Sequence, residues 1–214
     1  MSWFTGSDEA LEKAIDVDSP VAVQSAIKAG ANVNAKGKLG VSLLEYAIGH
    51  NSKRCFQELL RLGADPEQRD DEGDNAVTLA AIAFSKDRDY LILAIKAGGD
   101  PNTRRPDRDP ILVRFINDRN IEAIRMMKEL GADLDLRSRT DSPLLIDAGT
   151  IEYWDVVWTM LELGAKYDYK NEPFGWPEVF NKPKVTPPDS PLWPFKVKSW
   201  KFLKDHGVAV PDLS

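Results

Sequence analysis

One short motif returns along the chain at a nearly constant interval: an apolar residue, a glycine, a small residue and, in most copies, a polar one. Its glycines are 33, 35, 33 and 33 residues apart, at Gly30, Gly63, Gly98, Gly131 and Gly164. A degraded sixth copy is His206-Gly207-Val208. Self-similarity at a period of about 20 to 50 residues is typical of repeat arrays. We therefore expect a row of similar units, each contacting mainly its neighbours.

Each unit is predicted to contain two helices. About twelve residues after each of the first four glycines, a small polar residue precedes an apolar run, at Ser42, Asn75, Asp109 and Ser142. Such residues cap helix N-termini, and the proline that follows two of them is tolerated in the first turn. A second, longer helix then runs up to the next glycine, which suits the left-handed residue that ends a helix. The pattern predicts helix, turn, helix and a hairpin-like loop.

These units resemble the ankyrin repeat, which opens with T-P-L-H-x-A-A and closes with G-A-D-V-N. The opening is matched in part at 75–81 and 142–145, and the close at 30–34 and 63–66. The histidine of the opening is missing from every repeat, and only 70–73 keeps the D-x-x-G loop of the family. The resemblance covers about residues 8–172. It implies an all-α, ankyrin-like helix-turn-helix solenoid of about five repeats plus a degenerate C-terminal capping repeat.

The spacing places the five repeats in the first 172 residues, at about 7–36, 37–69, 70–104, 105–137 and 138–171. A proline-rich and aromatic segment, 173–194, then breaks the period, and a capping helix and tail follow at 195–214. The segment is too apolar for a free linker. We expect it to pack on the last repeats and to cover Trp158, which the helical spacing turns outward; the alternative is an aromatic arm for a partner.

The start of the sixth repeat stays open at this stage. The period from Gly164 places its first helix at 176–180, whereas similarity to the earlier helix starts places it at Ser190-Pro191-Leu192. Either choice leaves a final helix at about 195–206.

Composition narrows the classes of partner. The chain has 214 residues, a net charge of −6 and one cysteine. Binding to nucleic acid or anionic membranes depends on clustered Lys and Arg, so neither partner is expected. The first residues lack the basic and apolar regions of a signal peptide. We expect a cytoplasmic protein that is monomeric when free, with Cys55 as a small buried hydrophobe rather than a reactive thiol.

Charge at the expected loop tips alternates along the array: basic, acidic, basic and basic. These charges are either ordinary solvated loop residues or a pattern that a protein partner recognises. A position near the inner helix ends, at His50, is likewise either a solvated turn or a contact. The candidate partner-binding residues are Lys38, Leu39, Asp71, Glu72, Asp74, Arg105, Arg108, Arg139 and Asp141 at the tips, with Gly49, His50 and Asn117 near the inner helix ends.

Two charged residues stand 33 residues apart where the family places a small alanine in the packed first helix, Arg114 and Asp147. A charge near a helix interface needs a partner. We expect Arg114 and Asp147 to form a structural pair on adjacent helices; the alternative is a polar contact on the concave face for a bound partner.

Catalytic and cofactor chemistry is not indicated. The two histidines lie in different repeats, no Cys or His spacing suits a metal, and no glycine-rich phosphate loop follows a strand. The favoured function is a non-enzymatic module that binds, and masks or inhibits, a protein partner. A sharper version is a bacterial immunity protein that neutralises a cognate toxin. A second class is an assembly protein that self-associates through its aromatic C-terminal segment.

Overall fold

The computed structural model describes residues 2–169, 174–181 and 186–213, and it divides into two compact units, Met1–Asp107 and Arg108–Ser214. In these described ranges all regular structure is helical, apart from two isolated β-bridges inside loops. The predicted all-α class of helix–turn–helix repeats is confirmed.

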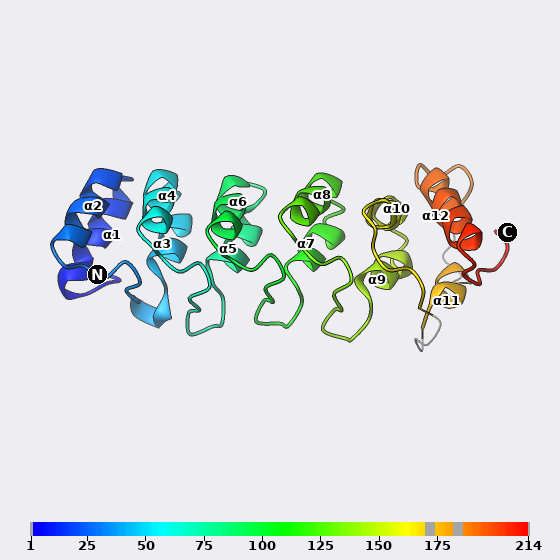
Figure 1. The fold of residues 1–214 in the computed structure, drawn as a ribbon, viewed down its shortest axis with the longest axis horizontal. Helices are drawn as coiled ribbons and strands as arrows, with labels where there is room; N and C mark the ends of the chain where they lie inside the picture. The colour runs from blue at the N-terminus through cyan, green and yellow to red at the C-terminus, as the bar shows by residue number, and fades with distance from the viewer. Residues whose placement is uncertain (1, 170–173, 182–185, 214) are drawn as a thin grey trace. The chain divides into compact units, whose positions relative to one another are not determined.

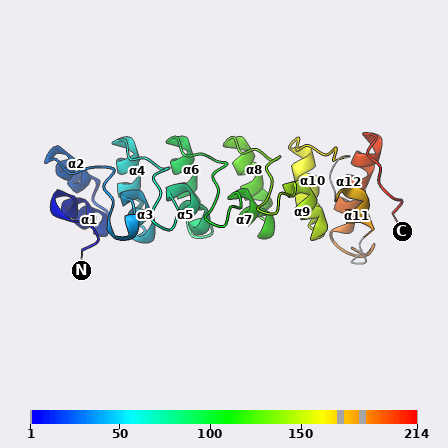
Figure 2. The same ribbon diagram turned by 90° about the horizontal axis from the view of Figure 1, so that it is seen from below.

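In residues 2–107 the first unit contains three helix pairs (Figure 1). The first helices α1, α3 and α5 pack in succession, and so do the second helices α2, α4 and α6. Figure 2 shows the helices of this unit as two rows. The elements are η1 Gly6–Asp8, α1 Glu9–Asp16, α2 Pro20–Lys28, η2 Lys38–Gly40, α3 Leu43–Gly49, α4 Lys53–Arg61, α5 Ala76–Ala83 and α6 Asp89–Lys96.

The described part of the second unit repeats this arrangement. Its first helices are α7, α9 and α11, and its second helices are α8, α10 and α12, again packed in succession. The bounds are α7 Leu112–Asn117, α8 Ile121–Glu129, α9 Leu144–Thr150, α10 Trp154–Glu162, α11 Trp176–Phe180 and α12 Trp193–Asp205.

Local sequence explains where the helices of the first unit begin and end. The Ser42 hydroxyl accepts the Glu45 backbone N–H at 3.2 Å, and the Glu45 carboxylate accepts the Ser42 N–H at 2.6 Å. Asn75 and Thr78 form the same reciprocal cap at the start of α5. Each cap satisfies N–H groups that have no intrahelical partner. The C-cap residue of α4, Leu62, is followed by Gly63 at φ 92°, a conformation that favours glycine.

The second helices contribute fully buried side chains to the core. Cys55, Phe56 and Leu59 of α4 are fully buried, and so is Leu91 of α6. The expectation that Cys55 is a buried hydrophobe is confirmed. Burial also raises the pKa of its thiol to about 12, so the nucleophilic thiolate is strongly disfavoured.

The repeat with the longer period places its extra residues in a turn. Residues 84–88 connect α5 to α6, whereas three residues connect the two helices of each neighbouring pair, at 50–52 and 118–120. The turn takes up the insertion, because a turn absorbs extra residues more easily than a packed helix.

The described residues of the aromatic segment resolve where the sixth repeat begins. Helix α11 packs on α9 as a first helix, and α12 packs on α10 as a second helix. The period therefore located the repeat correctly, and Ser190-Pro191-Leu192 lies in the long connection between its two helices. Pro173 and residues 182–185 of the predicted segment lie outside the described residues.

The packing of α11 depends on a glycine in α9. A Cβ added at Gly149 would stand 2.9 Å from Val179 Cγ1, and Trp176 of α11 is 1% exposed. Phe180 stacks on Trp154 of α10 at 5.0 Å. The described part of the segment thus packs on the repeats, as expected. The cover over Trp158 is different: it comes from Phe202 and Lys198 of α12.

Candidate functional site

The loop tips of the first unit are ordered by hydrogen bonds between neighbouring loops. The Asp71 N–H donates to the Leu39 carbonyl at 3.0 Å, and the Lys38 N–H donates to the Trp3 carbonyl at 3.0 Å. Arg69 donates to Thr103 Oγ1 of the next loop at 3.1 Å. Their backbones are therefore fixed relative to one another before any partner arrives.

The predicted tip residues of this unit are solvent-accessible. Leu39 is 62% exposed and places an apolar side chain at the loop tip. Lys38, Asp71 and Glu72 are also exposed, and Asp74 is half-buried. The structure brings these five residues to two adjacent, hydrogen-bonded tips.

Other predicted tip charges are paired within or between loops. Arg105 is 3.2 Å from Asp107 of its own loop. In the second unit Arg139 is 3.7 Å from Asp109 of the neighbouring loop, and its N–H also donates to that carboxylate. Asp141 accepts from Arg137 at 2.9 Å. Each pair includes at least one exposed residue and contributes little stability, but it holds the charged groups in defined positions.

Four tip residues share the same left-handed backbone conformation. They occupy matching places in successive loops, with φ of 71°, 90°, 73° and 60°, at Gly40, Gly73, Arg108 and Asp141. Arg108 is exposed, as is Asp141. A non-glycine residue in this conformation is disfavoured by about 1–2 kcal/mol. The sequence named Arg108 and Asp141 for their charge; the left-handed turn that displays them became visible only in the structure.

The inner helix ends differ between the two units. His50 stacks on Tyr46 with ring centroids 3.9 Å apart, and its Nε2 lies 3.8 Å from Asp16. The Tyr46 hydroxyl donates to the same Asp16 at 2.9 Å. This Asp16–Tyr46–His50 group is thus ordered and partly exposed. Gly49 is also exposed, and in the second unit Asn117 is exposed and lines a crevice described below.

The expected pair between Arg114 and Asp147 is not present. Arg114 Nε lies 3.8 Å from Asp118, one turn further along its own helix. The reason is a shift of one residue in the helix start: the N-cap of α9 is Pro143 rather than Ser142. The buried alanine places are consequently taken by Phe115 and Ala148.

With the shifted start, the two charged residues match Tyr46 and Leu79 of the first unit. Arg114 and Asp147 are both half-buried. Neither charge is removed from water, so neither needs the other to offset a desolvation penalty.

A crevice that the sequence did not reveal lies between α7 and α9. It has a volume of about 210 Å³, and its walls are mostly apolar, with Asn117, Asp147 and Thr150 as polar residues. The lining residues are Val113, Ile116, Asn117, Leu144, Asp147, Thr150 and Ile151. The spacing of the two first helices could have suggested a shared surface, but not a hollow one.

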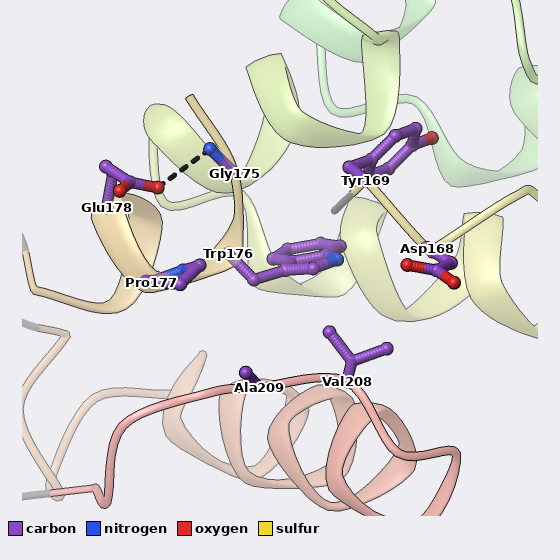
Figure 3. A pocket seen from close by; sticks show the side chains of 8 residues that line it. All are labelled: Asp168, Tyr169, Gly175, Trp176, Pro177, Glu178, Val208 and Ala209. Carbon is purple, nitrogen blue, oxygen red and sulfur yellow. Dashed lines mark hydrogen bonds between the residues drawn. The ribbon is translucent and has the colours of Figure 1, made fainter. Parts of the chain in front are cut away.

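A second crevice of about 250 Å³ lies beside α11 (Figure 3). Trp176 and Glu178 face it from α11, Asp168 and Tyr169 from the loop after α10, and Val208 and Ala209 from the C-terminal tail. Its polar groups have internal roles: Glu178 accepts the Gly175 N–H at 2.8 Å, and Trp176 donates to the Tyr167 carbonyl at 2.8 Å. The crevice therefore lies where the loop after α10 and the C-terminal tail meet α11.

The most perturbed carboxyl group lies inside a helix cap rather than in a crevice. Burial, together with repulsion from Asp70 and Asp74, raises the pKa of Glu45 from 4.5 to about 7. Its carboxylate is held by Ser42, and its side chain is 3% exposed, so a substrate could not reach it. Among the described residues no group of three potential ligands could hold a metal ion.

Comparisons with known proteins place the fold in a sequence context. No protein-family profile matches the chain. Over 140 residues it is 26% identical to a putative ankyrin repeat protein of Acanthamoeba polyphaga mimivirus, covering 58% of this chain and 19% of the relative. Over 134 residues it is 29% identical to an ankyrin repeat domain-containing protein of Stachybotrys chartarum, covering 63% of this chain and 7% of the relative.

A third relative is the E3 ubiquitin-protein ligase KEG of Arabidopsis thaliana, 35% identical over 94 residues, with 43% of this chain and 6% of that protein covered. The chain thus spans a fifth or less of the curated relatives it matches. Two of the three are named for ankyrin repeats, and this agrees with the helix–turn–helix units of the structure. In the described ranges the helices are too short or too polar to cross a membrane.

Proposed function

We propose, from the resemblance of this chain to ankyrin repeat proteins in sequence and fold, that it is a module that binds a protein partner and masks it. Stacked helix pairs present long surfaces with loops along one edge, and repeat proteins use such surfaces for recognition. The resemblance supports the general role of protein interaction. Masking of the partner is the finer part of the proposal.

The observation that carries the proposal is the order of the loop tips. Lys38, Leu39 and Asp71 are exposed, yet their backbones are fixed by hydrogen bonds: Asp71 donates to Leu39 of the neighbouring loop, and Lys38 donates to Trp3 of the N-terminal segment. A binding surface that is already ordered loses less conformational entropy on association. Leu39 has a left-handed backbone with φ 57°, and its side chain offers apolar area to a partner. The charged residues beside it provide specificity.

The predicted contact set is therefore kept as the proposed site. It comprises Lys38, Leu39, Asp71, Glu72, Asp74, Arg105, Arg108, Arg139 and Asp141, with His50 and Asn117 from the inner helix ends. The proposed protein is monomeric when free and cytoplasmic. The immunity role is a narrower version of masking, with a toxin as the partner.

Self-association is a less favoured alternative, because Trp176 is buried and Phe180 stacks on Trp154 within one chain. Light scattering tests it directly. A dimer that dissociates when 173–194 is deleted would favour assembly over binding.

The test of the main proposal starts with affinity purification of partners from the native source, followed by a measured dissociation constant. Arg105→Glu combined with Arg108→Glu should slow association by about tenfold or more and flatten its salt dependence, since charges at a rim mainly govern the on-rate. Lys28→Glu with Lys96→Glu is the matched control, because both lysines are exposed on second helices. Equal dissociation constants for both double variants would remove these tips from the site.

A further inference from the structure

The crevice between α7 and α9 combines an apolar lining with one carboxylate. Val113, Ile116, Leu144 and Ile151 form the apolar part, and Ile151 is 46% exposed at its edge. The volume of about 210 Å³ suits one long side chain rather than a folded element. The crevice belongs entirely to the second unit and lies on its first helices.

No hydrogen bond or ion pair engages the carboxylate of this crevice among the residues that the structure describes. Within the described residues Asp147 makes no side-chain hydrogen bond and no ion pair, although it is only half-exposed. Arg114, the partner expected from the sequence, lies 3.8 Å from Asp118 instead. Glu152, which follows the crevice in sequence, accepts from Thr186. The charge of Asp147 therefore remains open to a ligand.

Three kinds of occupant can be compared by their chemistry. An acidic side chain would be repelled by Asp147. A purely apolar one would cover the carboxylate and remove it from water without a compensating bond. A side chain with an aliphatic stem and a cationic end satisfies both parts, because the stem covers apolar surface while the charge meets Asp147.

We propose that this crevice receives a lysine or arginine side chain of the protein partner. The proposal rests on the proposed protein-binding function and specifies its chemistry at one point. The aliphatic stem lies against Val113 and Ile151, and the cationic group pairs with Asp147. Asn117 also lines the crevice, and its side-chain amide oxygen is a second acceptor.

The proposal can be tested without knowing the partner, by using Nα-acetyl-lysine N-methylamide as the probe on the full chain. Two-dimensional amide NMR at millimolar probe should show saturable shifts confined to α7 and α9. The norleucine analogue, which keeps the stem and lacks the charge, should bind at least about fivefold more weakly, as expected for the loss of one partly exposed charge-assisted contact.

Variants separate the two parts of the crevice. Asp147→Asn should weaken the lysine probe about fivefold or more and leave the norleucine probe unchanged. Ile151→Ala should weaken both probes. Glu129→Gln removes an exposed carboxylate of α8 that does not line the crevice, and it should change neither.

Two results would overturn the proposal: no saturable shifts with the lysine probe, or equal shifts for the lysine and norleucine probes in the unaltered chain. These failures differ from a failure of the proposed function. If the probe does not bind while the Arg105 and Arg108 variant still loses a purified partner, the crevice is wrong and protein binding stands. If the probe binds and no protein partner can be purified, the crevice binds a lysine side chain and the proposed protein-binding function is wrong.

Discussion

Replacing Glu45 by glutamine should remove a large part of the pH dependence of stability between about pH 4.5 and 7. Glu45 is the third residue of α3, where it completes the cap with Ser42, and it is 3% exposed. One carboxylate oxygen accepts the Ser42 N–H, and the other is buried without a hydrogen bond in the structure. Burial first, and then the charges of Asp70 and Asp74, raise its pKa to about 7.

The sign of the effect follows from the two protonation states. In the unfolded chain the carboxyl group loses its proton near pH 4.5, but in the folded chain it keeps it until about pH 7. The free energy of unfolding is therefore not reduced by Glu45 below about pH 4.5. It falls as the pH rises from there, and it levels off above about pH 7. The difference in pKa corresponds to a loss on the order of 3 kcal/mol in the free energy of unfolding.

Glutamine keeps the acceptor for Ser42 but carries no charge at any pH. We therefore expect Glu45→Gln to be more stable than the unaltered chain at pH 8 and similar to it at pH 4.5. Urea unfolding at several pH values measures this difference, and a carboxyl ¹³C NMR titration measures the pKa directly. Glu129→Gln, at an exposed carboxylate, should leave the profile unchanged.

Parallel pH profiles for Glu45→Gln and the unaltered chain would refute this reasoning. A Glu45 titration midpoint near 4.5 would do so as well, because it would show that the buried cap is better solvated than its 3% exposure indicates.

Three further perturbations test the packing. Gly149→Ala places a Cβ 2.9 Å from Val179, so it should lower stability by about 1–3 kcal/mol and raise the solvent exposure of nearby tryptophan, measured by urea unfolding and fluorescence quenching. Asn75→Ala removes the cap that pairs with Thr78 and should lower stability by about 1–2 kcal/mol; an unchanged urea midpoint would contradict the role of the cap. Cys55 should react with a thiol reagent only after unfolding, because it is 0% exposed and its pKa is raised to about 12; rapid labelling of the native chain would disprove this.

The candidate surface was only partly predictable. Charge and loop position were enough to name Lys38, Asp71 and Arg139, and the structure places all three on exposed tips. Sequence could not show that Arg139 is paired with Asp109, or that the first-unit tips are joined by backbone hydrogen bonds. Those contacts connect residues about thirty positions apart, so they depend on how one repeat lies against the next.

The sequence by itself determined the period, the helix–turn–helix unit and the buried cysteine. These depend on local rules: a cap, an apolar stripe and a glycine after the helix. The spacing of 35 residues between Gly63 and Gly98 also showed which repeat is two residues longer than the others.

Only the tertiary structure decided the choices that a shift of one residue changes. The first helix of the fifth repeat starts after Pro143, which moves Asp147 from a packed place to the edge of a crevice. The tertiary structure also showed that α11, not Ser190-Pro191-Leu192, packs on α9, because Gly149 leaves room for Val179. Local propensity tolerates either start for a short helix, and the neighbouring repeat selects the one whose side chains fit.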